Sequence, residues 1–587
     1  MSNLKISPSI FSAIKKIRIL LTRDDKIKCL FIAGFALLVS LFEIITAIVI
    51  VVFAQVLNDP SVGGKYMSKV GINEVLSPSR MVFYVSIVVG VIYLTKNLIA
   101  AVEVFFQNFV IQRVSYRFKN KLLSRYANSD YGFYLTRNSS FGLQVVGGDA
   151  EQTFSSGMIS LSTILSEGIV FSCLVAFIVF MNPSLALIVF LVGVVVSYTV
   201  SKILLPMFYS WGQKLQQSSM DASQNLLQFF HGFKEIILLG KSDFFVNKYH
   251  IHSKKKAKIQ AIQTATSALP RIIIEVLFVG MFVLTISYLC MEQESPMEMI
   301  GLLSGYLYVG FRLMPGLNRI INQLNDFKSV IPSIERVYNE YTSVTEKQNY
   351  IDSPNLKFTD SLVFKNVSFK YLNTHKNSLS NINLEIKKGE SIGVVGETGS
   401  GKSTLIDLVL GLLTPTSGNI LVDDKYHVNS FQWHKKIGYV PQSIYLTDDS
   451  IEANIAFGHD CIDEKKLNDV INAAQLRKLI DSLPNGIKTI TGERGMRLSG
   501  GERQRIAIAR ALYTDPEILI FDEATSALDN ETEAKLMETI NSVSKNRTVI
   551  MIAHRLTTLK DCNRIVRMES GSIRDINENI ERRVINA

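Results

Sequence analysis

Long apolar runs fill the first half of the chain, and short apolar runs alternate with polar stretches in the second half. Six of the long runs have about the twenty residues that a helix needs to cross a bilayer. They cover residues 29–57, 81–110, 156–181, 184–205, 270–290 and 297–322. A soluble domain cannot cover six such runs, so the sequence predicts a polytopic α-helical membrane domain over residues 1–342. We expect six transmembrane helices with long cytoplasmic extensions.

Basic residues indicate how these helices are oriented. Several lysines and arginines precede the first run, and Lys254–Lys256 lie in the long connection before the fifth. The short connection after the fifth run carries Glu292, Glu294 and Glu298 and no basic residue. Because basic segments stay on the cytoplasmic side, we expect a multi-pass protein of the inner (plasma) membrane with both termini in the cytoplasm. The net charge of +10 fits this inner face, and no interleaving of aromatic and basic residues indicates a nucleic-acid partner.

The second half has the pattern of an α/β domain. Residues 343–360 form a polar linker, and from 361 short apolar strands alternate with helical stretches. The predicted strands cover 362–369, 392–395, 437–440, 518–521 and 549–552. We therefore expect residues 361–587 to form an α/β P-loop ATPase domain with a mostly parallel sheet.

A glycine-rich segment follows the second of these strands and fits the phosphate-loop pattern. In Gly396–Ser403 the glycines allow several backbone N–H groups to converge on one anion, and a helix starting near Lys402 adds its positive dipole end. The side chain of Lys402 is expected to reach the terminal phosphates, and the Ser403 hydroxyl to bind Mg²⁺. The nucleotide-binding residues predicted here are Gly396, Glu397, Thr398, Gly399, Ser400, Gly401, Lys402, Ser403 and Thr404. The predicted cofactors are ATP and Mg²⁺.

Two further segments complete an ATPase pattern. Asp522 and Glu523 end a buried strand, where Asp522 can hold Mg²⁺ and Glu523 can polarise the attacking water. Ser499, Gly500, Gly501 and Glu502 begin a helix and form a second anion site. One ATP does not need two such sites from one subunit. The economical interpretation is a homodimer in which two chains enclose two ATP molecules.

The second half resembles the nucleotide-binding domain of ATP-binding cassette (ABC) transporters, and the whole chain resembles a half-transporter exporter. The resemblance implies that Tyr371 stacks on adenine and that Gln442 senses the γ-phosphate and contacts Mg²⁺. It also implies a switch histidine at His554, a D-loop at Asp529 and a contact with intracellular loops at Glu493. Tyr131–Tyr134 and Gly232–Lys241 resemble the two coupling segments of exporters. Glu502 departs from the family, which most often has glutamine there.

Charged residues inside the apolar runs are the candidates for substrate contact. A charge facing lipid costs at least about 2.5 kcal/mol, so Lys96, Arg271, Arg312 and Arg319 are expected to face a cavity or to be paired. Arg271 lies four residues before Glu275, and a simple helical ion pair is an equal alternative. Arg312 and Arg319 share one helix face, and their own run contains no nearby acid, which suits a phosphate or pyrophosphate group.

These segments resemble PglK-type lipid-linked oligosaccharide flippases. The resemblance implies that the chain flips a polyprenyl-pyrophosphate glycan, with membrane lipid and this glycolipid as partners. Two alternatives stay open. One is an exporter of another amphipathic substrate, such as a peptide, drug or lipid; the other is a membrane-anchored regulatory ATPase without transport.

Overall fold

The computed structural model describes residues 9–58, 77–181, 198, 200–291, 296–344, 356–372, 374–524, 530–544, 547–553 and 556–575. The chain forms two compact units. The helical unit contains the described residues up to Ala127 and Arg137–Val344. The C-terminal unit contains Asn128–Thr136 and the described residues after Val344. The division after Val344 falls at the polar linker.

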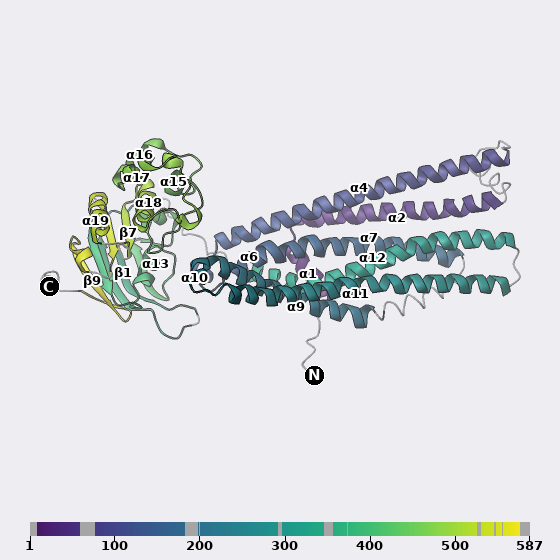
Figure 1. The fold of residues 1–587 in the computed structure, drawn as a ribbon, viewed down its shortest axis with the longest axis horizontal. Helices are drawn as coiled ribbons and strands as arrows, with labels where there is room; N and C mark the ends of the chain where they lie inside the picture. The colour runs from purple at the N-terminus through teal and green to yellow at the C-terminus, as the bar shows by residue number, and fades with distance from the viewer. Residues whose placement is uncertain are drawn as a thin grey trace. The chain divides into compact units, whose positions relative to one another are not determined.

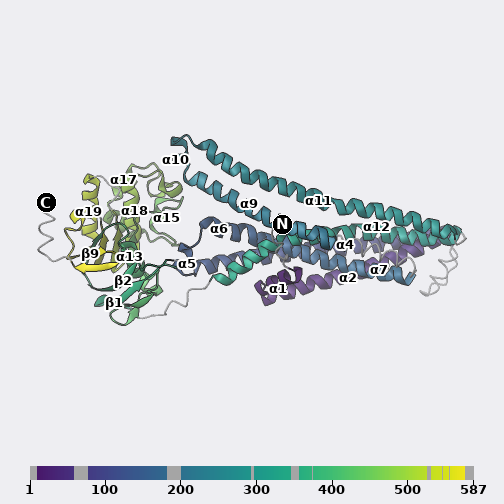
Figure 2. The same ribbon diagram turned by 90° about the horizontal axis from the view of Figure 1, so that it is seen from below.

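The helical unit consists of long helices joined by short ones (Figures 1 and 2). In chain order these are α1 (Ile10–Leu20), α2 (Arg23–Asn58), α4 (Pro78–Ala127), α6 (Ser139–Leu143), the π-helical segments η1 (Gln144–Asp149) and η2 (Gln152–Ser156), α7 (Gly157–Met181), η3 (Val200–Leu204), α9 (Leu205–His231), α10 (Phe233–Leu238), α11 (Ser242–Met291) and α12 (Pro296–Ser343). In both views α2 lies beside α4 and α9 lies beside α11 (Figures 1 and 2).

Four stretches of the described helices are long and apolar enough to cross a membrane. They are Arg23–Leu57, Pro78–Ala127, Ser140–Ala176 and Ser242–Gly280. The predicted run 297–322 lies within α12, and most of the predicted run 184–205 lies outside the described residues, so the count of six stays a prediction. Helices α4 and α11 have 50 residues each. At 1.5 Å per residue each is roughly 75 Å long, more than twice a hydrocarbon core of about 30 Å, as the predicted extensions require.

The buried core of the helical unit forms where α4, η2 and α12 meet. Phe118 and Phe154 pack with their ring centroids 4.4 Å apart, and Phe327 and Ile331 are fully buried beside them. Burying a side chain of this size contributes about 1.5–3 kcal/mol. This contact fixes α12 against the segment that connects α4 to α7.

Helices α9 and α12 approach each other closely at Gly212. A Cβ atom added there would lie 2.1 Å from the backbone carbonyl oxygen of Ser329. Only glycine allows this approach without moving a backbone, so Gly212 sets the spacing of the two helices at this point.

The C-terminal unit has two sheets. The four-stranded sheet has the order β2-β1-β4-β5, and the six-stranded sheet has the order β10-β9-β3-β8-β7-β6. The strands are β1 (Ser361–Phe369), β2 (Leu379–Lys387), β3 (Ser391–Gly396), β4 (Ser417–Val422), β5 (Tyr426–His427), β6 (Ile437–Val440), β7 (Ile518–Asp522), β8 (Thr548–Ile552), β9 (Arg564–Glu569) and β10 (Ser572–Asp575).

Helices surround these sheets within the C-terminal unit. They are α5 (Tyr131–Leu135), α13 (Lys402–Val409), α14 (Phe431–His434), α15 (Ile451–Ile455), α16 (Glu464–Ala473), α17 (Arg477–Ser482), η4 (Gly486–Lys488), η5 (Glu493–Gly495), α18 (Gly500–Tyr513), α19 (Asn530–Ser544) and η6 (Leu556–Leu559). The predicted strands β3, β8, β7 and β6 run parallel, and β9, which was not predicted, joins them in the same direction. The carboxyl ends of β3 and β7 therefore lie at one edge of the sheet, where α/β proteins bind ligands.

Strand β1 differs from the predicted arrangement. It lies in the smaller sheet and pairs antiparallel with both β2 and β4. Exposed positions interrupt its buried ones, as is typical of antiparallel strands with one covered face, whereas β7 and β8 are buried at every position.

Helix α5 belongs to the C-terminal unit although its sequence lies among the membrane helices. Asp130 caps its N-terminus, accepting a hydrogen bond from the backbone N–H of Gly132 over 2.8 Å. Tyr131 packs against the core of this unit, and Gly132 lies near the side chain of Leu413. The first predicted coupling segment therefore folds with the α/β unit.

Candidate nucleotide site and membrane charge network

The glycine loop connects β3 to α13 in the C-terminal unit. Gly401 has a φ of +108°, and a Cβ there would lie 2.9 Å from the carbonyl oxygen of Ser378. No side chain caps α13, so its first N–H groups are open to an anion. The ammonium group of Lys402 donates to the carbonyl oxygens of Gly396 (2.8 Å) and Glu397 (3.0 Å). The buried hydroxyl of Ser400 has no hydrogen-bond partner among the described residues. These features fit a phosphate group.

The loop lines an open cavity of about 1200 Å³. Tyr371 borders it, with its hydroxyl 3.0 Å from that of Thr404 and its ring edge-on to Phe369. Gln442 and Glu523 line it as well. The sequence did not indicate Arg567 to Gly571, which also line it from the end of β9 and the turn that follows, because this segment carries no motif.

The two acids at the end of β7 have different surroundings. Asp522 is buried, and burial raises the pKa of its carboxyl group, although the hydroxyl of Tyr439 donates to it over 3.3 Å. A divalent cation would relieve this cost. Ser403, Gln442 and Asp522 offer the oxygen ligands that Mg²⁺ prefers, and Mg²⁺ usually needs only one or two carboxylates besides phosphate and water. No cluster of three metal-binding His, Cys, Asp or Glu side chains occurs in the described parts of the chain.

Glu523 has a strained backbone. Its φ is +49°, a left-handed conformation that few residues with a side chain adopt. Its backbone N–H donates to the carbonyl oxygen of Ile552 over 3.1 Å, and its carboxylate accepts a hydrogen bond from the side-chain amide of Gln442. The structure thus brings together two of the three predicted catalytic residues. His554 and Asp529 lie outside the described residues.

Asp407, in α13, is an additional acid near this site that the sequence did not indicate. Burial raises the pKa of its carboxyl group to about 6, and the neighbouring charge of Asp522 adds to the shift. Its position after the glycine loop resembles any polar helix residue, so no motif marks it.

The second anion site begins α18. The hydroxyl of Ser499 accepts from the backbone N–H of Glu502 (3.4 Å), and the Glu502 carboxylate accepts from the backbone N–H of Ser499 (2.7 Å). This capping box gives Glu502 a structural role that glutamine could also fill. Further along α18, the buried amide of Gln504 donates to the carbonyl oxygen of Ala524. The start of α18 is thereby tied to the residue after Glu523.

In the helical unit, three of the four predicted substrate cations form one network with two acids. The ammonium group of Lys96 lies 3.2 Å from a carboxylate oxygen of Glu43. Arg312 lies 2.7 Å from the other oxygen of Glu43 and 3.3 Å from Glu167. Arg319 lies 2.9 Å from Glu167. Four helices, α2, α4, α7 and α12, each contribute to this network.

These pairs correct the picture of an unneutralised cationic stripe. The run that contains Arg312 and Arg319 indeed lacks a nearby acid, but Glu43 and Glu167 reach them from other helices. Arg271 forms an ion pair with Glu275, at 3.0 Å, and both side chains are largely exposed (70% and 49%). At Arg271 the structure therefore contains the helical ion pair, which was the alternative to a substrate contact.

Two family models match the chain. The model of the ABC transporter transmembrane region matches residues 30–306, and the ABC transporter model matches residues 379–526. Together they cover more than two thirds of the sequence. The first model falls on the helical unit but also spans Asn128–Thr136, and the second falls on the C-terminal unit.

The chain is also similar to curated proteins and to a solved structure. An ATP-dependent lipid A-core flippase of Chromohalobacter salexigens is 28% identical over 75% of this chain and 76% of its own length. The alpha-hemolysin translocation ATP-binding protein HlyB of Escherichia coli O157:H7 is 41% identical over 47% of this chain, but only 39% of HlyB is covered. A bacterial Atm1-family ABC exporter with ATP bound has a TM-score of 0.74 at 22% identity, covering 92% of this chain and 96% of that one. This likeness shows the exporter fold.

Proposed function

Because this chain is an ABC exporter, with a transmembrane and an ATPase domain that couples ATP hydrolysis to transport, we propose that it flips a phosphorylated glycolipid. The specific substrate that we propose is a polyprenyl-pyrophosphate-linked oligosaccharide, moved from the cytoplasmic to the outer leaflet. The observation that carries the proposal is the charge network of Lys96, Arg312 and Arg319 with Glu43 and Glu167.

The ion pairs of the network join three cations to two acids. The side chains of Glu43 and Lys96 are 5% and 7% exposed, so this pair is buried. The side chain of Arg319 is 48% exposed, so this member of the network is accessible. Separating a buried charge from its partner is costly, which keeps the network assembled without substrate. A phosphate group can replace Glu167 as the partner of Arg312 and Arg319, since guanidinium groups bind phosphate in a bidentate manner. Such an exchange would let an anionic head group enter an apolar domain.

The ATPase site supplies the energy in this proposal. Lys402 and the N-terminus of α13 would hold the phosphates, Tyr371 the adenine, and Ser403, Gln442 and Asp522 the Mg²⁺ ion, which neutralises phosphate charge. Glu523, oriented by Gln442, would take a proton from the attacking water. We propose that Ser499 to Glu502 of a second copy close the site, with His554 and Asp529 acting beside it.

Coupling and topology complete the proposal. Tyr131 in α5 and the segment Gly232–Lys241, with Glu493, would pass closure of the ATPase domains to the membrane helices. The homodimer would lie in the inner (plasma) membrane with both chain termini in the cytoplasm.

The test uses the full chain in lipid nanodiscs. Undecaprenyl pyrophosphate bearing an oligosaccharide should stimulate ATP hydrolysis, and Arg312→Ala with Arg319→Ala should raise the half-stimulating lipid concentration at least about tenfold, as expected for loss of charged hydrogen bonds. Arg271→Ala removes the same charge outside the network and should change it little. Unchanged stimulation in the double variant would refute the phosphate contact.

A second candidate is export of another amphipathic substrate. The lipid A-core flippases and toxin translocation proteins among the relatives favour it. Stimulation by lipid A or by a peptide, with no response to the polyprenyl lipid, would select it. ATP hydrolysis that no membrane substrate alters would instead indicate a regulatory ATPase.

A further inference from the structure

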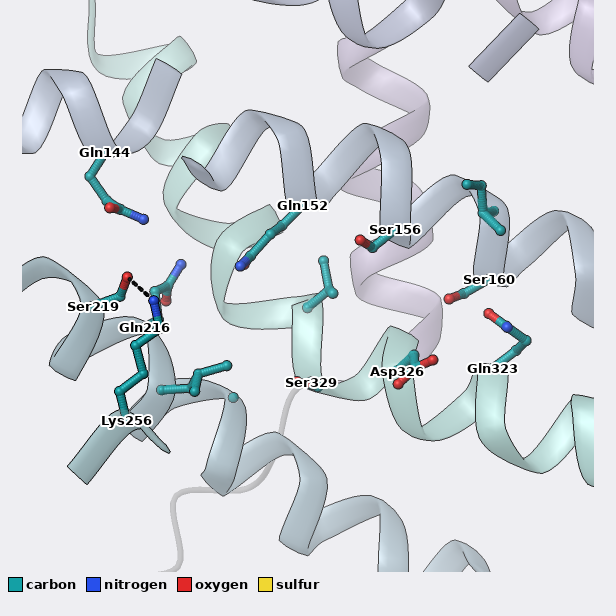
Figure 3. Close-up of a pocket in the computed structure, with 14 residues that line it drawn as sticks. Gln144, Gln152, Ser156, Ser160, Gln216, Ser219, Lys256, Gln323, Asp326 and Ser329 are labelled. Atoms are coloured by element: carbon teal, nitrogen blue, oxygen red, sulfur yellow. Dashed lines mark hydrogen bonds between the residues drawn. The ribbon is translucent and has the colours of Figure 1, made fainter. Parts of the chain in front are cut away.

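A second cavity lies inside the helical unit (Figure 3). Its volume is about 430 Å³, and residues of η1, η2, α7, α9, α11 and α12 line it. Its polar lining residues are Gln144, Gln152, Ser156, Ser160, Gln216, Ser219, Lys256, Gln323, Asp326 and Ser329. None of the roles assigned above uses this cavity.

The lining is rich in amides and hydroxyls and nearly free of net charge. It contains four glutamines and four serines, with one lysine and one aspartate. Each amide and each hydroxyl can both donate and accept a hydrogen bond. Such a lining matches a ligand whose own groups also do both, and it contains no arginine to favour phosphate.

Several of these groups are available to a ligand. The side chains of Gln323, Ser156 and Ser160 form no hydrogen bond with any described residue, although Ser160 is only 1% exposed. In Figure 3 Gln323 and Ser160 face each other across the cavity, and Asp326 lies on the same side as Gln323. A buried polar group without a partner is costly unless water or a ligand satisfies it.

Local backbone geometry builds one wall. Gln144, Gln152 and Ser156 lie on the π-helical segments η1 and η2, and such segments occur frequently at functional sites. Gly212, in α9, also lines the cavity, and its lack of a side chain brings α9 against α12.

The cavity adjoins the charge network along α12. Arg319, Gln323 and Asp326 follow one another at i, i+4 and i+7, on one face of the helix. Gln323 is about 6 Å and Asp326 about 10 Å further along the axis than Arg319. This is the distance over which a sugar follows the phosphate to which it is joined.

We propose that this cavity binds the sugar part of the transported glycolipid, while the arginines bind its phosphate. The inference rests on the proposed function and adds to it a subsite for a polyhydroxylated, uncharged group.

The test compares two lipids that differ only in sugar. The full chain in nanodiscs is assayed for ATPase stimulation by undecaprenyl pyrophosphate and by the same lipid carrying an N-acetylglucosamine disaccharide. The sugar should lower the half-stimulating concentration in the wild type. In Gln323→Leu and Ser160→Val this gain should shrink about 3- to 10-fold, the effect of losing one or two neutral hydrogen bonds.

Matched variants exclude a general loss of structure. Gln217→Leu, on the exposed side of α9, should retain the full sugar gain, and Gln323→Asn, which keeps an amide, should retain part of it. Each variant is normalised to its own rate without lipid. A sugar gain that is unchanged in Gln323→Leu and Ser160→Val overturns the inference.

Failure of the proposed function gives a different result. If neither lipid stimulates, binding of the free disaccharide to the nanodisc-embedded chain is measured by saturation-transfer NMR. Binding that Gln323→Leu weakens supports the sugar site, and its absence overturns it. Glutathione, a charged tripeptide, is tested in the same way. If it binds and Gln323→Leu weakens its binding, the sugar site is overturned in favour of a peptide site.

Discussion

At the scale of single residues, Glu523 combines a strained backbone with a directed hydrogen bond. The left-handed φ of +49° directs its carboxylate toward Gln442, and both side chains line the nucleotide cavity. Strain of this kind persists where the surrounding structure compensates for it, and the parallel strands β7 and β8 do so here. The geometry therefore supports a specific chemical role.

We expect Glu523→Gln to reduce ATP turnover at least about 100-fold, since the amide cannot accept the proton of the attacking water. ATP binding should remain. Phosphate release and retention of labelled ATP measure the two effects. Glu538→Gln, on the exposed side of α19, serves as the control, and full turnover in Glu523→Gln would refute the role as general base.

The raised pKa of Asp407 predicts a dependence of stability on pH. The pKa is about 6 in the folded chain against 3.8 for an unperturbed carboxyl group. Between these values the folded state holds the proton more tightly, so stability falls as pH rises from about 4 to 6 and stays lower above that.

Asp407→Asn should remove this loss. At pH 8, without nucleotide or Mg²⁺, the free energy of unfolding of the variant should exceed that of the wild type by about 1–2 kcal/mol after allowance for solvent screening. At pH 4 the gain should disappear. Thermal unfolding at the two pH values checks this, and an equal gain at both would show that burial of the charge is not its cause.

At the scale of elements, the sequence was most informative where chemistry lies within a short segment. The glycine loop, the acids after β7 and the start of α18 were each found from local pattern. The acids that pair with the arginines were not, because Glu43 lies 269 residues and Glu167 145 residues from Arg312. A charge in an apolar run shows that a partner is required, but not which helix supplies it.

The close approach of α9 and α12 gives an element-scale prediction. Gly212→Ala should destabilise the helical unit by about 1–3 kcal/mol, because the new methyl group meets a backbone carbonyl that no rotamer change can move. A lower thermal midpoint measures it. Gly142→Ala, where nothing lies within 4 Å, should be neutral or stabilising. Equal midpoints for the two variants would contradict the prediction.

At the scale of the whole molecule, each chain carries two anion sites, the glycine loop and the start of α18. One ATP does not need both of them from the same chain. The proposed homodimer joins the glycine loop of one copy to Ser499 of the other. The fold of both units could be predicted from the alternation of apolar runs, whereas pairing of two copies could be inferred only from the need for a second anion site.

Complementation tests this pairing. Lys402→Ala and Ser499→Arg should each abolish ATP hydrolysis when expressed alone. Co-expressed, they should restore about a quarter of the wild-type rate, because half of the dimers are mixed and each mixed dimer has one intact site. No recovery, with mixed dimers shown by pull-down of two tags, would refute a site shared between chains.

The position of α5 has a consequence for how the protein is made. Tyr131 and Gly132 pack within the C-terminal unit, yet they are synthesised more than two hundred residues before its first strand. The segment that covers the apolar surface around Leu413 is therefore synthesised first. It can pack there only after the ribosome has completed the C-terminal unit. An ATPase fragment cut after Val344 lacks that cover, and we expect it to aggregate unless a peptide spanning 128–136 is supplied.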